Sequence, residues 1–567
     1  MKKKHNLITA ALLYANGPVH IGHLAGAYLP ADIYSRFLRL KKEQVLFVCG
    51  SDEHGAAITL KAKKENKKPK EIVDFFHKKN KNSFKNIGID FDIFDRTSSE
   101  EHHVNSANYF NKLNNNKYFF KEESNQFYDE DYNQFLADRY IKGECPKCDY
   151  YEAYGDQCEK CGSALNPQEL KNPISTLSLK SPVLKKTEHW YLPMKNHEKW
   201  LKEWLLKGVF EGQKKHNVKK WRKQVVSQCR SWLDGGLKSR AMTRDLDWGV
   251  KVPLPNYENK VLYVWLDAPI GYISATQKYC LKNNLNWIDF WQKDNSKIVH
   301  FIGKDNIVFH CVIFPIILKC LGDFNLPNNV VANEFLNIEG NKISTSKNWA
   351  VWLDDYLKDF SGQEDALRYT LCITAPESKD NDFTWKEFQA RNNNELVAIL
   401  GNFINRVFVL IHKYWEGKVP DNITYIKHDK EFLSNLNNIK HKIDLKIRDF
   451  KLKEALGEIM NIARIGNKFL AENEPWKLIK ENEERTKTIL FISIEIIRQI
   501  CIFIKPFLPF TSNKLQKMLN IDNELSWEDL DKTFKSNHIL NKPILLFRII
   551  EDEEIKHQIQ QLKNNRL

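Results

Sequence analysis

Residues 12–23 read Leu12-Leu-Tyr-Ala-Asn-Gly-Pro-Val-His-Ile-Gly-His23, and this stretch decides how the surrounding chain folds. The apolar run 6–12 predicts a buried strand, residues 16–18 predict a turn, and the amphipathic run 24–40 predicts a helix. His20 and His23 then lie one turn apart, on the same side of the helix start. Backbone N–H groups and the positive end of the helix dipole favour phosphate there, and Gly22 lets a flat ligand approach closely. Taken alone, the same residues fit a pair of ordinary turn histidines.

The next segment extends this unit. Residues 45–49 predict a second strand, parallel to the first because the intervening helix crosses over between them. In such a βαβ unit the ligand lies at the carboxyl ends of the strands. Residues 50–55, Gly-Ser-Asp-Glu-His-Gly, begin where the second strand ends. We therefore expect Asp52 to face the same crevice as His20 and His23.

The composition bounds the class of protein. A chain of 567 residues is too long for one core and predicts three to five structural units. Its 42% hydrophobic and 28% charged residues are ordinary for a soluble globular protein. The net charge of +14 is compatible with a nucleic-acid partner, although lysine and asparagine are abundant throughout the chain.

No segment predicts export or membrane insertion. Residues 2–4 are lysines and residues 7–13 are apolar, but the run is short and lacks a signal cleavage site. The apolar run 489–510 is interrupted by charges and suits a buried bundle helix better than a membrane span. We expect a cytoplasmic protein with reduced thiols and no membrane partner.

Four of the eleven cysteines form two CxxC pairs nine residues apart. Each CxxC turn directs two thiolates at one centre, and two such turns complete the tetrahedral S4 shell that Zn²⁺ prefers. A closed shell leaves no place for water, so we expect one structural zinc. The alternatives are two unrelated pairs or a redox dithiol. The predicted ligands are Cys145, Cys148, Cys158 and Cys161.

The remaining pattern divides the chain. Strands are predicted at 261–266, 298–302 and 330–332, with a helix at 307–321, while residues 121–229 lack a βα rhythm and read as an insertion. Beyond about residue 383 the pattern is helical, clearest in 396–411 and 455–470. We expect an α/β fold: a Rossmann-type doubly wound parallel sheet with an inserted zinc-knuckle subdomain and a C-terminal α-helical bundle. The expected segments are 1–120, first half of the sheet domain; 121–235, insertion; 236–327, second half of the sheet domain; 328–384, a connecting region; and 385–567, the helical region.

Six segments span nearly the whole chain: ALLYANGPVHIGH, SDEHG, CPKC…CEKC, YVWLDAPIGY (263–272), FIGKDN (301–306) and GNKISTS (340–346). Together, and in this order, they resemble the motifs of the methionyl-tRNA synthetases, which are class I aminoacyl-tRNA synthetases. The resemblance implies activation of methionine with ATP to methionyl-adenylate and pyrophosphate, followed by transfer to the 3′ end of tRNA(Met) in translation.

Adenylate formation places demands that these residues can meet. A carboxylate attacks the α-phosphorus of ATP, so the protein must mainly position the reactants and neutralise charge. We expect His20, His23 and Lys342 to be catalytic, and Mg²⁺ to accompany ATP. Asp305 is placed to accept hydrogen bonds from the ribose hydroxyls; the alternative is that Asp305 forms a structural salt bridge. The resemblance implies an ATP site of His20, His23, Gly303, Asp305, Lys342, Ser344 and Thr345.

Methionine selection requires an apolar slot for a thioether and a few groups that fix the amino and carboxylate ends. Asp52 is the natural partner of the ammonium, and Arg244 would hold that carboxylate. Outside this context, the aromatic residues would read as ordinary core packing. The resemblance maps the slot onto Ala11, Leu12, Tyr14, Asp52, Arg244, Trp265, Ala268, Pro269, Tyr272, Asn306 and His310.

One motif departs from the family. The usual Lys-Met-Ser-Lys-Ser loop reads Lys-Ile-Ser-Thr-Ser here, so Thr345 replaces the second lysine. A cation for pyrophosphate is missing at that position, and Lys347 is the nearest substitute.

The helical region resembles the family's anticodon-binding bundle. RNA loops are read by stacking unpaired bases on aromatic or guanidinium planes. The resemblance implies anticodon contacts at Asn402, Arg406 and Trp476. Trp476 follows a long helix beside a proline, so we expect it to be displayed rather than buried.

Two alternatives remain. A leucine, isoleucine or valine synthetase shares the same elements but typically carries a larger editing insertion than the roughly hundred residues here. A non-catalytic tRNA-binding relative would explain Thr345 but not the retention of the histidines, Asp52 and Lys342. The expected partners are tRNA(Met), ATP and methionine, and we expect a monomer.

Overall fold

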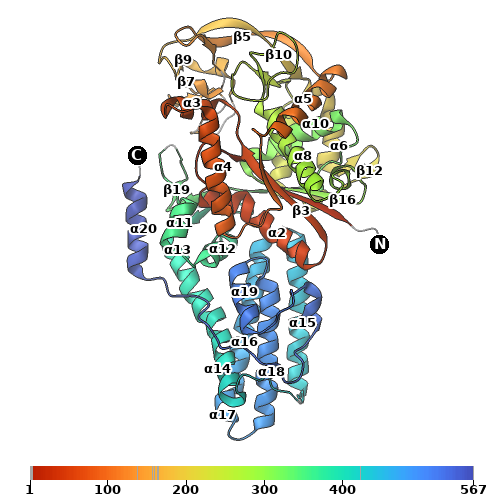
Figure 1. Cartoon of the computed structure of the whole chain (residues 1–567), viewed down its shortest axis with the longest axis vertical. Helices are drawn as coiled ribbons and strands as arrows, with labels where there is room; N and C mark the ends of the chain where they lie inside the picture. The colour runs from red at the N-terminus through yellow and green to blue at the C-terminus, as the bar shows by residue number, and fades with distance from the viewer. Residues whose placement is uncertain are drawn as a thin grey trace.

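Among the described residues, a six-stranded parallel sheet of five longer strands and one strand of two residues forms the centre of the N-terminal half (Figure 1). All of its neighbouring strands are parallel. The strand order across the sheet is β4 (Ile93–Arg96), β3 (Gln44–Asp52), β1 (His5–Ala10), β16 (Ser296–Gly303) and β17 (Asn329–Asn333). By position in the chain this is 3-2-1-4-5, the Rossmann order, in which the crevice opens at the carboxyl ends of the central strands. The predicted doubly wound sheet is therefore confirmed.

The computed structural model describes residues 4–136, 138–155, 158, 160–161, 165–345, 347–421 and 423–565. The sheet and its helices lie above a long helical bundle, and the inserted segment caps the opposite end (Figure 1).

The chain leaves β1 through β2 (Leu13–Tyr14), which pairs with the end of β3. The predicted helix 24–40 is present, but it begins earlier and includes a π-helical turn: α1 (Ile21–His23), η1 (Leu24–Tyr28) and α2 (Leu29–Leu40). A π turn changes the backbone hydrogen-bond pattern, and the amide of Asn333 donates 2.8 Å to the carbonyl of Ala25 within it. β17 thereby helps to hold the helix start in place.

The prediction of a strand at 261–266 is wrong. Only β15 (Val261–Leu262) is extended, and it pairs antiparallel with β14 (Thr243–Arg244). The rest of the run opens α8 (Val264–Lys282), a largely buried helix. Because a fully buried helix needs no polar face, a short apolar run cannot distinguish it from a strand. The strands predicted at 298–302 and 330–332 are confirmed as β16 and β17. The helix predicted at 307–321 is observed as η7 (Phe309–Ile313) and α10 (Phe314–Leu321).

The inserted segment is antiparallel. Its main ladder pairs β5 (Phe120–Asp129) with β10 (Val183–Leu192), and a smaller sheet combines β7 (Ile141–Glu144), β8 (Ala153–Tyr154) and β9 (Lys171–Ser175). Helices α6 (Glu198–Lys207) and α7 (Lys223–Asp234) fall inside the predicted segment 121–235. Leu201 and Val225 on these helices nevertheless share a hydrophobic core with Leu7 of β1 and Ile298 of β16.

The C-terminal bundle contains the helices predicted at 396–411 and 455–470. Its main members are α14 (Asn402–Trp415), α15 (Lys427–Arg448), α16 (Leu452–Asn473), α18 (Glu483–Ile504) and α19 (Pro509–Met518). Helix α18 is buried along most of its length, as expected for a bundle helix. The continuous helix Trp385–Trp415, formed by α13 (Trp385–Ala390), η8 (Arg391–Gly401) and α14, has the length and composition of a membrane span. Its apolar residues Phe403, Ile404 and Val407 pack into the bundle core.

One buried ion pair joins the bundle to the sheet. Arg368 on α12 (Glu364–Ile373) is fully buried and donates 2.6 Å to Asp32 of α2. It also donates to the carbonyls of Gly88 and Phe507, from the sheet side and the bundle side. Removing Asp32 would leave the Arg368 charge buried without its carboxylate, whereas Asp32 also pairs with Arg36 at 2.9 Å. Arg368 therefore helps to fix how the two parts meet.

Candidate active site and metal centre

His20 and His23 form a compact pair at the start of α1. Their rings stack with centroids 3.6 Å apart, and His20 is the N-cap residue. The backbone N–H of each histidine donates to Nδ1 of the other, at 3.4 and 3.3 Å. The two side chains therefore cap the helix reciprocally, as a Ser and Glu do in a capping box.

This capping fixes the proton positions. Burial holds the pKa of His23 at about 4 and, together with the neighbouring His23 ring, holds the pKa of His20 well below its usual range. Both rings are therefore neutral at pH 7, and each Nδ1 accepts a hydrogen bond. The single ring proton must lie on Nε2 in both residues. The pair presents two N–H donors at a helix start, an arrangement that suits an anion.

The KISTS segment lies against this pair. A Cβ atom at Gly22 would lie 2.6 Å from Cδ1 of Ile343, so the Ile343 side chain lies directly against the helix start. The N–H of Ile21 donates 3.1 Å to the carbonyl of Val351, and the His20 ring lies 5.8 Å from that of Trp352. Segments more than three hundred residues apart in sequence thus border one region.

Lys342 and Asp305 belong to the same region. Lys342 is exposed on β19 (Asn341–Lys342), with Nζ 5.4 Å from the Phe335 ring centroid. Desolvation raises the pKa of Asp305, and the charges of Lys304 and Lys342 oppose that shift. Lys304 pairs with Glu334 and Asp380, and no described cation lies within ion-pair distance of Asp305.

The other predicted nucleotide-site residues lie nearby. A Cβ at Gly303 would lie 2.6 Å from Oδ1 of Asp305, so a larger residue there would displace the Asp305 side chain. Ser344 and Trp349 exchange two backbone hydrogen bonds of 3.0 and 2.9 Å, and the side chain of Thr345 is exposed. Ser346 lies outside the described residues.

A cavity of about 260 Å³ opens beside the carboxyl end of β3. Nine of the eleven residues predicted for the amino-acid slot line it: Leu12, Tyr14, Asp52, Trp265, Ala268, Pro269, Tyr272, Asn306 and His310. Its walls come from β2, β3, α8 and η7, so the cavity exists only in the folded chain. Its size suits a small amino acid and not a large ligand.

Tyr272 and His310 form a neutral pair in the wall. The hydroxyl of Tyr272 lies 2.9 Å from Nε2 of His310, and Nδ1 of His310 lies 3.0 Å from the carbonyl of Asn306. A carbonyl only accepts, so the His310 proton is on Nδ1 and Tyr272 donates to Nε2. Burial lowers the pKa of His310 to about 4, which keeps the ring neutral. The pair offers polarity without charge, which suits a thioether.

Asp52 is a buried carboxyl that lacks one partner. It is 9% exposed, and Oδ1 has no hydrogen-bond partner among the described residues. Burial, with a contribution from the charge of Asp267, raises the pKa of Asp52 to about 7. An unsatisfied acceptor of this kind in a cavity wall is suited to a cationic group of a ligand.

Two predicted slot residues, Ala11 and Arg244, lie next to described lining residues but are not in the lining themselves. Arg244 stacks on Tyr263, 3.8 Å from the ring centroid, and donates 3.1 Å to the carbonyl of Thr243. The carbonyl of Ala11 accepts from the Tyr28 hydroxyl at 2.9 Å. Neither residue is among the described residues that line the cavity. The sequence reasoning missed His54, Gly55, Ala56, Ala57, Arg139, Leu246, Tyr263, Val264 and Phe309 in the lining. His54 and Gly55 lie in the quoted SDEHG segment, so their position beside Asp52 could have been predicted from the sequence.

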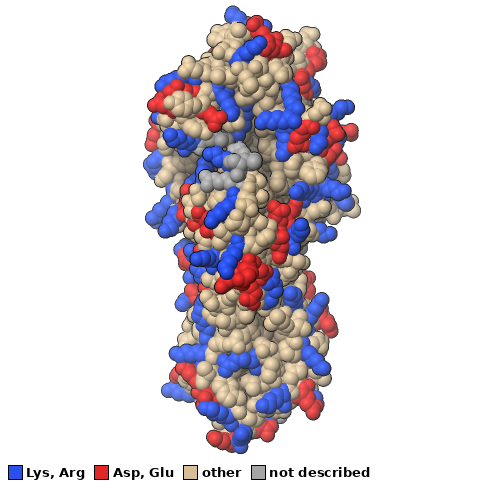
Figure 2. Space-filling model, turned by 90° about the vertical axis from the view of Figure 1, so that its left-hand side faces the viewer, with Lys and Arg blue, Asp and Glu red and all other residues tan. Residues whose placement is uncertain are grey.

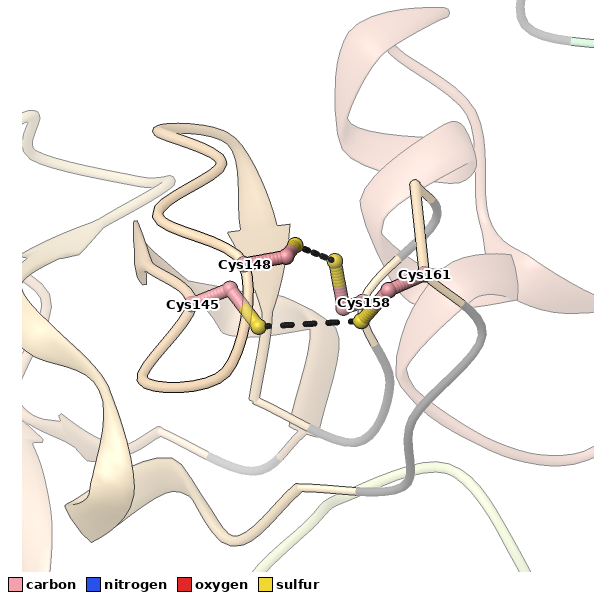
Figure 3. A group of neighbouring side chains, drawn as sticks. All are labelled: Cys145, Cys148, Cys158 and Cys161. Carbon is pink, nitrogen blue, oxygen red and sulfur yellow. Dashed lines mark hydrogen bonds between the residues drawn. The ribbon is translucent and has the colours of Figure 1, made fainter.

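The four CxxC cysteines meet at one point. Their sulfur atoms all lie within 4.8 Å of one another and face a common centre (Figure 3). The Sγ atoms of Cys145 and Cys161 are 3.9 Å apart, and those of Cys148 and Cys158 are 3.6 Å apart. Zn–S bonds of about 2.3 Å in a tetrahedron place sulfurs about 3.8 Å apart, whereas a disulfide needs about 2.05 Å. The four thiols fit one Zn²⁺ ion and lie in the insertion, where Cys145 and Cys158 share a hydrophobic cluster with Ala56 and Leu246 of the cavity lining.

The three predicted anticodon residues lie on α14 and α17 (Pro475–Leu478), and Figure 1 shows α17 at the end of the bundle away from the sheet. The guanidinium of Arg406 lies 4.9 Å from the centroid of the Trp476 ring, and Asn402 is exposed one turn before Arg406. Trp476 is half-buried and packs against the bundle core, so the ring is displayed only in part. The proline and the left-handed Glu474 (φ 39°) turn the short helix back onto the bundle.

Known proteins resemble the whole chain. The family model described as tRNA synthetases class I (M) matches residues 6–408, and that of the anticodon binding domain of methionyl tRNA ligase matches residues 419–566. The methionine–tRNA ligase of Bacteroides fragilis is 54% identical over 561 residues, covering 99% of this chain and 81% of that protein. The methionine–tRNA ligase of Cytophaga hutchinsonii is 54% identical over 574 residues, covering 100% and 82%.

Solved structures share the fold. The Mycobacterium tuberculosis methionyl-tRNA synthetase in complex with methionyl-adenylate superposes with a TM-score of 0.79 at 22% identity. The match covers 96% of this chain and 99% of that one.

Proposed function

The chain belongs to the methionine–tRNA ligase family of class I tRNA synthetases, and we propose which of its residues carry out each step of that family's reaction. The reaction joins methionine to tRNA at the expense of ATP. The observation that carries the assignment is the cavity with the unpartnered Asp52 oxygen, beside the carboxyl ends of a Rossmann sheet.

We propose that His20 and His23 hold the phosphates of ATP through their Nε2 protons. The transition state gathers negative charge on the phosphoryl oxygens, and donors already fixed in position stabilise it without reorganisation. Lys342 adds a positive charge from the KISTS segment, and Asp305 accepts the ribose hydroxyls. Mg²⁺ accompanies ATP and supplies further charge neutralisation.

Methionine would fill the cavity with its ammonium on Asp52 and its side chain between Trp265 and Tyr272. The methionine carboxylate would then lie toward the nucleotide, where it attacks the α-phosphorus in line. The Tyr272–His310 pair offers a weak polar contact to the thioether sulfur without charge. This neutrality favours methionine over charged side chains of similar length.

The tRNA would span the long axis of the molecule. Figure 2 shows lysine and arginine side chains spread over one face from end to end of the molecule, interspersed with acidic side chains. Together with a net charge of +14, this face suits a polyanion. Asn402, Arg406 and Trp476 would contact the anticodon, because exposed bases stack on aromatic and guanidinium planes. We further propose that the protein acts in the cytoplasm as a monomer.

Pyrophosphate exchange by the purified protein tests the proposed function. With Mg²⁺, ATP and methionine as the only amino acid, exchange should be rapid, whereas leucine, isoleucine and valine should not support it. Exchange with one of those three amino acids would favour another synthetase, and no exchange with any amino acid would indicate a non-catalytic tRNA-binding protein.

Lys342→Ala should slow adenylate formation more than Thr345→Ala does. The alanine removes a charge near the phosphates, whereas the exposed Thr345 hydroxyl contributes little. We expect a loss of about 10- to 100-fold for Lys342→Ala, corresponding to one charge-assisted hydrogen bond. Pre-steady-state consumption of ATP measures both variants, and equal losses would contradict the assignment.

Trp476→Ala should impair tRNA charging and leave pyrophosphate exchange intact. Loss of one base–aromatic stack costs about 1–3 kcal/mol, which lowers kcat/KM for tRNA about 5- to 150-fold. Because the ring also packs on the bundle, Trp476→Phe is the matched control and should retain most of the charging rate. A parallel loss of exchange in Trp476→Ala would refute an anticodon role.

A further inference from the structure

A buried array of histidines around one carboxylate lies directly behind the cavity. Asp267 of α8 is fully buried, with Oδ2 2.5 Å from Nδ1 of His54 and Oδ1 2.5 Å from Nε2 of His102. His54 itself lines the cavity, two residues after Asp52. On its other side, Nε2 of His54 lies 3.3 Å from Nε2 of His103. The adenylation chemistry assigned above uses none of these four residues.

The contacts assign a charge to each group. Burial would raise the pKa of Asp267, but His54 and His102 lower it far more, so Asp267 is ionised. Burial would lower the pKa of His54, but the charge of Asp267 and its hydrogen bond raise it above the usual range. His103 is neutral because burial and the His54 charge lower its pKa to about 4. His54 can therefore donate from Nδ1 to Asp267 and from Nε2 to His103, as an imidazolium does.

We propose that His54, held by Asp267, is a positioning residue whose charge keeps Asp52 in the carboxylate form that binds the ammonium of methionine. This inference rests on the proposed function, because it needs methionine in the cavity. Asp52 and Asp267 would otherwise face each other as two buried negative charges, and like charges in a shared site suppress ionisation of one of them. The His54 imidazolium contacts Asp267 directly. It also lies two residues after Asp52 in the chain, and the backbone N–H of His54 donates to the Asp52 carboxylate.

Among the groups that face Asp52, His54 supplies the positive charge that favours its carboxylate form. The titratable groups that face Asp52 and His54 are Asp267, Glu53, His102, His103, Tyr14 and Tyr272. The Glu53 carboxylate is paired with Arg96 at 2.8 Å. Burial keeps the pKa of Tyr14 and Tyr272 above the usual range, so both are neutral. Arg139 also lines the cavity, and it comes from the insertion.

Three variants test the charge relation. In His54→Asn, the amide can still donate to Asp267, but the positive charge is gone and Asp267 repels Asp52 without compensation. We expect the methionine KM at pH 7 to rise about three- to tenfold, since one pKa unit is a factor of ten in ionisation, and the defect to shrink as pH rises to 8.5. Asp267→Asn removes the repelling charge and with it the reason for protonating His54, so its methionine KM should change less. The double variant should recover toward Asp267→Asn.

Several controls separate this role from a structural one. The ATP KM should be unchanged in all variants, and His103→Asn, which keeps an acceptor for His54, should change the methionine KM less than about twofold. An analogue with a hydroxyl in place of the methionine ammonium should bind wild type and His54→Asn equally well. If His54→Asn does not fold, as judged by circular dichroism, His54→Gln replaces it.

An unchanged methionine KM in the His54 variant would overturn the inference, as would a double variant at least as impaired as His54→Asn. Absence of methionine-dependent exchange in the wild type would instead overturn the proposed function, so the two failures are distinguishable.

Discussion

His23→Asn is expected to form methionyl-adenylate about 10²- to 10³-fold more slowly than the wild type, the loss typical of removing one preorganised donor to a developing negative charge. The oxygen of asparagine reaches the position of Nδ1, so it can still accept the N–H of His20 and cap the helix. What disappears is the Nε2 proton. The measurement is single-turnover formation of adenylate with saturating methionine.

A matched variant isolates that proton. In His23→Gln the amide nitrogen reaches the position of Nε2, so a donor remains while the reciprocal cap is weakened. We expect His23→Gln to recover part of the lost rate and to melt at a lower temperature than His23→Asn. If the two variants lose activity equally, the pair serves only to cap α1, and the phosphate assignment is wrong.

Asp52→Asn is expected to lower kcat/KM for methionine by a factor of roughly 30 to 1,000, which corresponds to about 2–4 kcal/mol for one partner of a buried charge pair. The amide keeps the shape of the carboxyl group but cannot neutralise an ammonium. Its effect should appear mainly in the methionine KM, because the nucleotide lies at the other end of the substrate. Pyrophosphate exchange over a range of methionine concentrations measures it.

The same residue gives the wild type a pH dependence. Since the pKa of Asp52 is raised to about 7 in the free protein, its carboxylate is depleted at pH 6 and nearly complete at pH 8. The methionine KM should therefore fall as pH rises through this range, whereas that of Asp52→Asn should stay flat. The hydroxyl analogue of methionine supplies the control, since its binding should depend on neither pH nor this substitution. A pH-dependent KM in Asp52→Asn would point to a different titrating group.

Local sequence patterns correctly predicted the elements whose structure depends on neighbouring residues alone. The strand–turn–helix around His20, the parallel strands after it and the two CxxC turns each follow from neighbouring residues, and the structure contains them. These features need only hydrophobic periodicity, turn residues or ligand spacing. The π turns at η1 and η7 leave no comparable pattern in the sequence, and both lie beside the predicted site.

Predictions that depended on contacts between residues far apart in the sequence were less accurate. The run 261–266 was predicted as a strand because apolar residues alone cannot reveal that both sides of α8 are buried. Arg244 stacks on Tyr263, a pairing that adjacent positions in the sequence do not reveal. Trp476 packs on the bundle because α17 turns back, which depends on the left-handed Glu474.

The sequence by itself determined the residue types that the chemistry needs and the short segments that present them: paired imidazoles at a helix start, a carboxyl at a strand end, and four thiols in two turns. Only the tertiary structure decided that Asp267 lies between His54 and His102, and that one oxygen of Asp52 has no partner among the described residues. Both arrangements arise because α8, α5 (Glu100–Asn115) and β3 meet through long-range packing. Charge states depend on burial and on neighbours within a few ångströms, and both are set by the fold and not by adjacency in the chain.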